Sequence, residues 1–120
     1  MTSFVACGGT TAVHTSTPPI AFGITGGNVV GYRVSIQPDG SIRSTGSARA
    51  IRRQITAARL RQLRDEIEHA HLTSRSCPGV LPDLARQFIR VGRRTVTVHG
   101  NCDAAFTRVW RDLARAIALR

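Results

Sequence analysis

A stretch of alternating side chains between residues 29 and 45 constrains the fold more than any other part of the chain. Over 30–37, apolar residues share one face and polar residues the other, which is typical of a half-buried strand. The Pro-Asp-Gly sequence at 38–40 predicts a turn, because proline presets its backbone angle and glycine accepts a positive one. Residues 41–45 run back as a second strand, so the unit is an antiparallel hairpin with one apolar face that requires a cover.

Two later segments have the periodicity of amphipathic helices that can provide this cover. Residues 57 to about 71 follow Thr56, which suits an N-cap, and repeat apolar side chains at spacings of three and four. Residues 103 to about 118 carry a broader apolar stripe, and Asn101 or Asp103 can cap their first turn. Further strands are expected over 20–24, 86–91 and 95–98. The last two form a second hairpin around a short turn that contains glycine.

The predicted fold is α+β: a two-layer sandwich in which an antiparallel sheet of two hairpins is covered on one face by two helices. A chain of 120 residues suits a single domain. We place that domain at 20–120 and interpret 1–19 as a flexible N-terminal tether, since its small, polar and turn-forming residues leave little to bury. The sequence has no apolar run of the roughly 18 residues that a membrane-spanning helix needs.

The first residues resemble the end of a bacterial lipoprotein signal. A hydrophobic residue and small residues at 4–6 precede Cys7, the residue that receives the lipid in such signals, and a Thr/Ser/Pro-rich tether follows. Only six residues precede this cysteine, fewer than a charged region and an apolar region require. We therefore expect Met1 to lie within a longer signal and the domain to be exported to the cell envelope or beyond. With a genuine start at Met1, the protein would be cytoplasmic.

The other two cysteines, Cys77 and Cys102, lie at boundaries of predicted elements. In an exported domain they can form a disulfide, and closing a loop of about 26 residues is worth roughly 3–4 kcal/mol. In a reducing cytosol they would be two unrelated thiols. With Cys7 lipidated, the remaining even number is what one bonded pair requires.

The charge of the chain is strongly basic, and all of it comes from arginine. The net charge is +10, and the 17 basic residues include no lysine. Such an excess favours anionic partners, although a GC-rich coding bias also raises arginine without selecting a ligand. Four arginines are candidates for a basic sheet face: Arg33, Arg90, Arg93 and Arg94. We do not expect nucleic acid as a partner, because Tyr32 and Trp110 both have core positions and leave few platforms for base stacking.

Catalytic, metal and cofactor sites are not predicted. The sequence has no nucleophile elbow, no zinc-protease motif and no phosphate loop. His99 and Cys102 have the spacing of a ligand pair, but no second pair follows. The acids are scattered and suggest no acid–base pair. We therefore expect a protein that is not an enzyme and that needs no cofactor.

Two resemblances extend over most of the predicted domain. From residue 25 to 117 the layout resembles emfourins, small bacterial inhibitors of thermolysin-type metallopeptidases. This likeness rests on the Gly-Gly-Asn-Val-Val-Gly run at 26–31 and on the Pro-Asp pair at 82–83, which precedes a hairpin. The Tyr-x-Val-x-Ile-x-x-Asp-Gly pattern at 32–40 is similar to a family of uncharacterised envelope lipoproteins. The first resemblance implies a peptidase inhibitor, and the second implies an anchored envelope domain.

We expect a non-enzymatic, exported binding or interaction domain of the cell envelope. Its partner would be another protein, a peptidase among the candidates, and a lipid anchor would be its only membrane association. Its ligand and oligomeric state stay open. The alternatives are inhibition of a thermolysin-type metallopeptidase and binding of an anion or nucleic acid through an arginine-rich sheet face.

An inhibitor of this kind would need an accessible apolar loop, since thermolysin-type enzymes take a bulky apolar side chain beside the zinc. The candidates are Gly26, Gly27, Asn28, Val29, Val30 and Gly31. The glycines would let the backbone approach an enzyme closely. A simpler expectation, which we prefer, is that both valines are buried at the start of a core strand.

Overall fold

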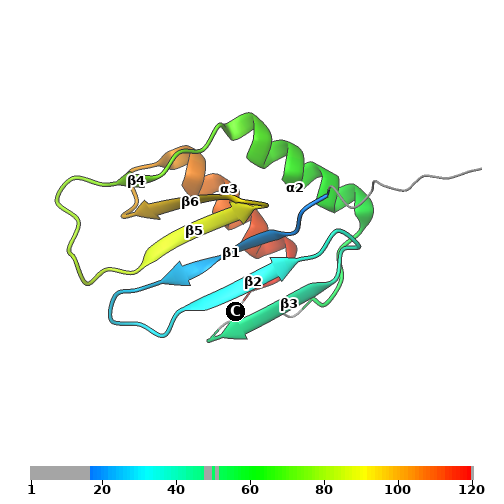
Figure 1. The fold of residues 1–120 in the computed structure, drawn as a ribbon, viewed down its shortest axis with the longest axis horizontal. Coiled ribbons are helices and arrows are strands. Elements are labelled where there is room, and N and C mark those ends of the chain that lie inside the picture. Colours follow the sequence, from blue (N-terminus) through cyan, green and yellow to red (C-terminus); the bar gives the residue numbers. More distant parts are fainter. Residues whose placement is uncertain (1–16, 48–49, 51, 120) are drawn as a thin grey trace, which may run out of the picture.

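The computed structural model describes residues 17–47, 50 and 52–119. Eight elements follow one another along the chain: β1 (Ile20–Thr25), β2 (Tyr32–Ile36), β3 (Ile42–Gly46), α2 (Ala57–Ala70), β4 (Arg75–Ser76), β5 (Arg86–Val91), β6 (Arg94–His99) and α3 (Ala104–Ala116) (Figure 1). They form a small α+β domain with a six-stranded, mostly antiparallel sheet and two helices. The predicted α+β class is therefore confirmed.

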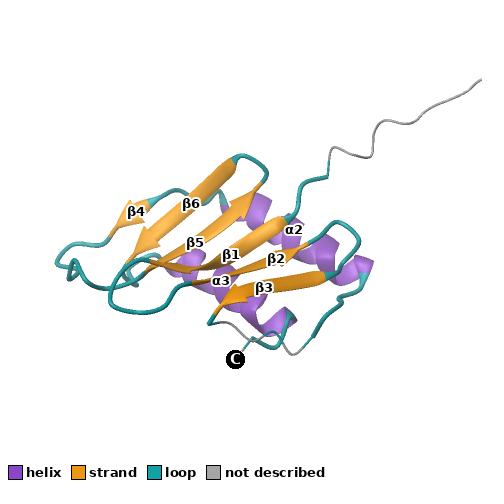
Figure 2. Cartoon of the chain, turned by 60° about the horizontal axis from the view of Figure 1, so that its bottom comes forward, coloured by secondary structure: helices purple, strands orange, loops and turns teal. Residues whose placement is uncertain are grey.

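The sheet contains both predicted hairpins, but they are not its only strands. The strand order is β3-β2-β1-β5-β6-β4, and each pair is antiparallel except β4 with β6. β1 lies at the centre, between the β2–β3 and β5–β6 hairpins. β4 was not predicted, because two residues are too few to show a period. Both helices lie on the same side of the sheet (Figure 2).

The core lies between the sheet and the two helices. Side chains of alternate strand positions meet the apolar stripes of α2 and α3, and those with no exposed surface are Ile20, Phe22, Val34, Ile36, Phe106, Leu113 and Ile117. The rings of Phe22 and Trp110 meet edge to face with centroids 5.6 Å apart. The indole Nε1 of Trp110 donates to the carbonyl of Gly23 at 3.3 Å, which ties α3 to the central strand.

α2 begins at the predicted cap Thr56, and α3 begins at Asp103, one of the two residues predicted as its cap. The Thr56 hydroxyl accepts from the amide of Arg59 at 3.1 Å, and Asp103 Oδ1 accepts from the amide of Phe106 at 3.0 Å. These bonds satisfy amides that have no partner inside the first turn. At the other end of α2, His71 takes the left-handed conformation that stops the helix.

The predicted tether and lipidation residue fall mainly in the part of the chain that is not described. Cys7 and the rest of 1–16 lie there, so the lipoprotein prediction is not tested by the structure. Within 17–47, 50 and 52–119, neither helix has the length and apolar character needed to cross a membrane.

Candidate functional site

Two loops that are far apart in the sequence meet at one end of the sheet. Residues 26–31 connect β1 to β2, residues 77–85 connect β4 to β5, and Figure 1 shows both at the same end. The backbone amide of Asn28 donates to the carbonyl of Asp83 at 3.1 Å. Its side-chain Nδ2 donates to the Asp83 carboxylate, also at 3.1 Å. The two loops are thus joined by paired hydrogen bonds.

The contact between the loops requires glycine at position 27. Gly27 has a φ of 70°, in the left-handed region that favours glycine. A Cβ atom there would lie 2.6 Å from both the carbonyl oxygen of Asp83 and the amide nitrogen of Ala85. Any side chain would therefore push the two loops apart.

All four large apolar side chains that are exposed in the described part of the chain lie on these two loops. The exposed fractions are 53% for Val29, 72% for Val30, 68% for Leu81 and 48% for Leu84. We call Val29, Val30, Leu81 and Leu84 the apical surface. An apolar group of this kind, concentrated at one place, is typical of an interaction site.

The exposure of the valines corrects the simpler expectation from the sequence. We expected Val29 and Val30 to start a core strand, but β2 begins only at Tyr32. Positive φ angles at Gly26 and Gly27 turn the chain. The amide of the next residue, Asn28, then bonds to the carbonyl of Asp83 in the other loop and not to a neighbouring strand. Apolar character alone therefore predicted the wrong environment for the two valines.

The 77–85 loop is fixed near both of its ends. The amide of Cys77 donates to the carbonyl of His99 at 2.8 Å. The buried ring of His99 donates from Nε2 to the carbonyl of Leu84 at 2.7 Å, since a carbonyl can only accept. The backbone of Leu84 is therefore held while its side chain stays exposed.

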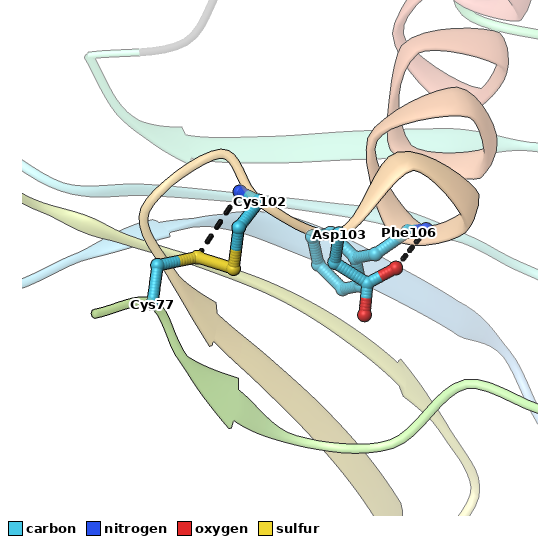
Figure 3. Close-up of a disulfide and its surroundings, with 4 residues drawn as sticks. All are labelled: Cys77, Cys102, Asp103 and Phe106. Atoms are coloured by element: carbon cyan, nitrogen blue, oxygen red, sulfur yellow. Dashed lines mark hydrogen bonds between the residues drawn. A yellow bond between two sulfur atoms is a disulfide. The ribbon is translucent and has the colours of Figure 1, made fainter.

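The predicted disulfide between Cys77 and Cys102 is present and anchors the same loop (Figure 3). The two Cα atoms are 5.7 Å apart, and the amide of Cys102 donates to Cys77 Sγ at 3.0 Å. Cys102 directly precedes Asp103, the cap of α3, so the bond attaches the loop to the start of a core helix. The sequence separation of 25 residues corresponds to a stabilisation of about 3.5 kcal/mol in the chain-entropy account.

An open hollow of about 580 Å³ lies beside the apical surface. Leu81 and Leu84 line it together with Ile24 and with the backbone around the disulfide. The hollow makes this part of the surface concave, with room for a side chain of another molecule between the two leucines and Ile24 at the end of β1.

The four candidate arginines do not share one face. Arg33 and Arg90 are exposed on the face of the sheet opposite the helices, because they alternate with the core residues Val34 and Ile89. Arg93 lies in the β5–β6 turn. The guanidinium of Arg94 lies on the helix side and donates to the carbonyl of Leu72, so Arg94 is not part of the outer face.

The sequence did not identify all the arginines of that outer face. Arg43 and Arg86 are also exposed there, because they pair with outward-facing positions of the neighbouring strands. Arg43 could be placed there only once its pairing with Ser35 was known, whereas the two-residue period of β5 puts Arg86 on the same face as Arg90.

The described residues form no candidate metal cluster. Among residues 17–47, 50 and 52–119, no three His, Cys, Asp or Glu side chains lie close enough to hold a metal ion. His99 and Cys102, which have the spacing of a ligand pair, are engaged by the carbonyl of Leu84 and by the disulfide. The residues of the apical surface have no acid–base or nucleophilic chemistry, and their side chains can act only by contact.

The chain matches no protein-family model, no curated protein and no solved structure. The function must therefore be argued from the geometry of the two loops.

Proposed function

We propose that the chain is a non-enzymatic, exported domain that binds another protein through the apical surface. The observation that carries the proposal is the placement of Val29, Val30, Leu81 and Leu84 on two loops that are hydrogen-bonded to each other. Elsewhere in the described chain, the large apolar side chains are buried or partly buried.

The fixed conformation of the loops supports this role. Binding costs free energy when a loop must become ordered, and a loop that is already held avoids much of that cost. Here the Asn28–Asp83 bonds, the His99 ring and the disulfide hold the backbone on either side of the exposed side chains. Exposed apolar side chains on a backbone that is already held can be buried by a partner at a small ordering cost.

The partner that suits the surface best is a thermolysin-type metallopeptidase. The emfourin resemblance rests on the runs 26–31 and 82–83, and these are the segments that meet at the apical surface. Enzymes of this type take a bulky apolar side chain beside the zinc, and Val30 and Leu81 are the most exposed candidates. The domain would act as an inhibitor by filling that part of the enzyme.

The proposed location is the cell envelope, with Cys7 lipidated and the Thr/Ser/Pro-rich segment as a tether. In a two-layer sandwich of this kind, the tether joins β1 at Ile20, and the apical surface follows the other end of the same strand. Six residues of strand span about 20 Å, so the surface would point away from the anchor. Mass spectrometry of the mature protein tests the location: a lipid on Cys7 supports it, and an unmodified Cys7 contradicts it.

An inhibition titration with thermolysin tests the proposed function. The variants are Val29→Asp/Val30→Asp and Leu81→Asp/Leu84→Asp, each of which places carboxylates in the apolar contact. Loss of interface anchors worth about 2 kcal/mol raises the inhibition constant about 30-fold or more. The matched control is Ala57→Asp/Ala58→Asp, which adds the same two charges at exposed positions in the first turn of α2.

Two outcomes contradict the proposal in different ways. Equal inhibition by the apical variants and by the unmodified chain would exclude the apical surface as the contact. No inhibition of any thermolysin-type enzyme by the unmodified chain would exclude the inhibitor function. Circular dichroism of each variant shows whether its fold is intact.

A further inference from the structure

The charges of this chain are segregated between the strands and the rest of the domain. Six arginines lie on the strands, namely Arg33, Arg43, Arg75, Arg86, Arg90 and Arg94. All seven acids lie outside the strands and within the described residues: Asp39, Asp65, Glu66, Glu68, Asp83, Asp103 and Asp112. α2, by contrast, carries as many acids as arginines. A coding bias raises arginine everywhere, so it does not explain why the acids avoid the sheet.

Four of the strand arginines occupy the sheet face opposite the helices, and the register fixes their positions. Arg43 and Arg90 lie at the two ends of one row of paired residues across the sheet. In this row Arg43 pairs with Ser35 on β2, Ser35 pairs with Ala21 on β1, and Ala21 pairs with Arg90 on β5. Three strand spacings separate their Cα atoms by about 14 Å. Arg86 and Arg90 are four residues apart on β5, or about 13 Å. The row that contains Arg33 passes through Gly23 to Phe88, so along the strands Arg33 lies between the levels of Arg86 and Arg90.

The same face carries one aromatic side chain at its centre. Phe88 lies between Arg86 and Arg90 on β5 and pairs with Gly23. It is half-buried, whereas the three arginines nearest to it in register are exposed. Gly23 and the buried Ala21 form the middle of the face, so no large side chain rises from the central strand there. The arginine face, defined as Arg33, Arg43, Arg86, Arg90 and Phe88, therefore has small residues of the central strand at its middle.

The four guanidinium groups are not neutralised within the described domain. The ion pair found there is Arg115–Asp112 on α3, at 3.9 Å. The nearby carboxylate of Asp39 interacts only weakly with Arg43. The pKa of Asp39 is lowered mainly by hydrogen bonds from Ser41 and to a smaller extent by the Arg43 charge. That carboxylate is held by Ser41 at 2.7 and 2.9 Å. Arg90 Nε donates to the carbonyl of Gly92 at 2.8 Å, and the terminal nitrogens of Arg90 can still bind an external anion.

We propose that the arginine face docks on the anionic phosphate headgroups of a phospholipid membrane. Guanidinium groups bind phosphate oxygens in a bidentate manner, and a membrane presents many phosphates to charges that are spread over one face of a sheet. Phe88 would lie at the level of the headgroups, where an aromatic ring between cations is favourable.

The disulfide favours a membrane over nucleic acid as the occupant. A disulfide persists in oxidising compartments, where membrane lipid is the abundant phosphate-bearing surface. This step rests on the proposed export of the domain. The docking would hold the domain on the membrane in addition to the lipid anchor. It would leave the apical surface free, because the loops that carry this surface lie at one end of the sheet (Figure 2).

Vesicle co-sedimentation tests the proposal with the full, non-lipidated chain. The vesicles contain either phosphatidylcholine alone or equal parts of phosphatidylcholine and phosphatidylglycerol. The face variant replaces Arg33, Arg43, Arg86 and Arg90 by Ser. The control variant removes the same charge elsewhere, at four exposed arginines: Arg53, Arg61, Arg108 and Arg111. Each arginine near an anionic surface contributes about a fivefold change in binding, so the face variant should fall to the level seen with neutral vesicles.

The expected result is salt-sensitive binding of the unmodified chain and of the control variant to the anionic vesicles only. A Phe88→Ser variant should bind more weakly than the unmodified chain at the same salt concentration. Equal loss of binding in the face and control variants would overturn the proposal, because net charge would then be the cause. Tighter binding to a single-stranded oligonucleotide than to vesicles would also overturn it. Inhibition of a peptidase by the face variant should be unchanged, so the two proposals can fail separately.

Discussion

Two glycines in the loops that carry the apical surface, Gly27 and Gly79, act through the backbone conformation that they permit. Gly27 and Gly79 both have positive φ, at 70° and 73°. A Cβ at Gly79 would meet nothing within 4 Å, whereas one at Gly27 would meet the backbone of the other loop at 2.6 Å. The two positions share the same conformational cost and differ in the loop contact.

This difference predicts unequal effects of two alanine substitutions. Gly79→Ala should lower the free energy of unfolding by about 1–2 kcal/mol, the cost of a left-handed conformation. Gly27→Ala should lower it by at least about 1 kcal/mol more, because the loops must also separate, in line with other strained substitutions. Chemical denaturation measures both values. Equal losses would mean that the contact between the loops contributes no stability.

At the scale of elements, the two helices are joined by a pair of acids as well as by their apolar stripes. Burial, followed by a hydrogen bond with Asp112 and the charge of that residue, raises the pKa of Glu66 from 4.5 to about 7. Arg59 and Arg108 oppose this shift but do not cancel it. Glu66 on α2 therefore keeps its proton in the folded protein over a range where the unfolded chain has lost it.

The sign of the pH dependence follows from this proton. Between about pH 4.5 and 7 the folded state binds more protons at Glu66 than the unfolded state does, so stability falls as the pH rises through this range. Glu66→Gln should remove that part of the slope, because glutamine keeps a donor but does not ionise. Glu68→Gln, an exposed position on the same helix, is the control. The free energy of unfolding of the three proteins is measured by denaturation across this pH range. The same dependence on pH in all three would contradict the assignment of the proton to Glu66.

The sequence predicted most elements, because each has a period of its own. The alternation at 30–37 and the stripes of both helices are local patterns. Thr56 was predicted as a cap from its position, and Asp103 was one of two candidates for the second cap. The meeting of the two loops could not be predicted, because the Asn28–Asp83 pair spans 55 residues. The same reason explains the error at Val29 and Val30, since their exposure depends on a contact that no local pattern encodes.

At the scale of the whole molecule, the domain presents distinct surfaces in different directions. The helices lie on one side of the sheet, and the loops that carry the apical surface lie at one end (Figure 2). The strand register places the arginine face on the side opposite the helices. Cys77 and Cys102 connect the apical end to α3 (Figure 3). This arrangement allows one end to bind a protein while another surface carries the charge.

The disulfide should therefore affect both stability and binding. Replacing Cys77 and Cys102 together by Ser should lower the free energy of unfolding by about 3.5 kcal/mol. It should also weaken peptidase inhibition, because the 77–85 loop loses its attachment to α3. Denaturation and inhibition assays on the double variant measure the two effects, with the oxidised unmodified chain as the reference. A loss of stability with unchanged inhibition would show that the bond does not organise the apical surface.

Hydrogen exchange in a complex tests the central claim most directly. The unmodified chain is mixed with a catalytically inactive thermolysin-type peptidase, and amide exchange is measured with and without the enzyme. We predict slower exchange in residues 27–31 and 80–85 together, with α2 and the β5–β6 turn unchanged. Protection confined to other segments, or no protection in either loop, would contradict the proposal that the apical surface binds the enzyme.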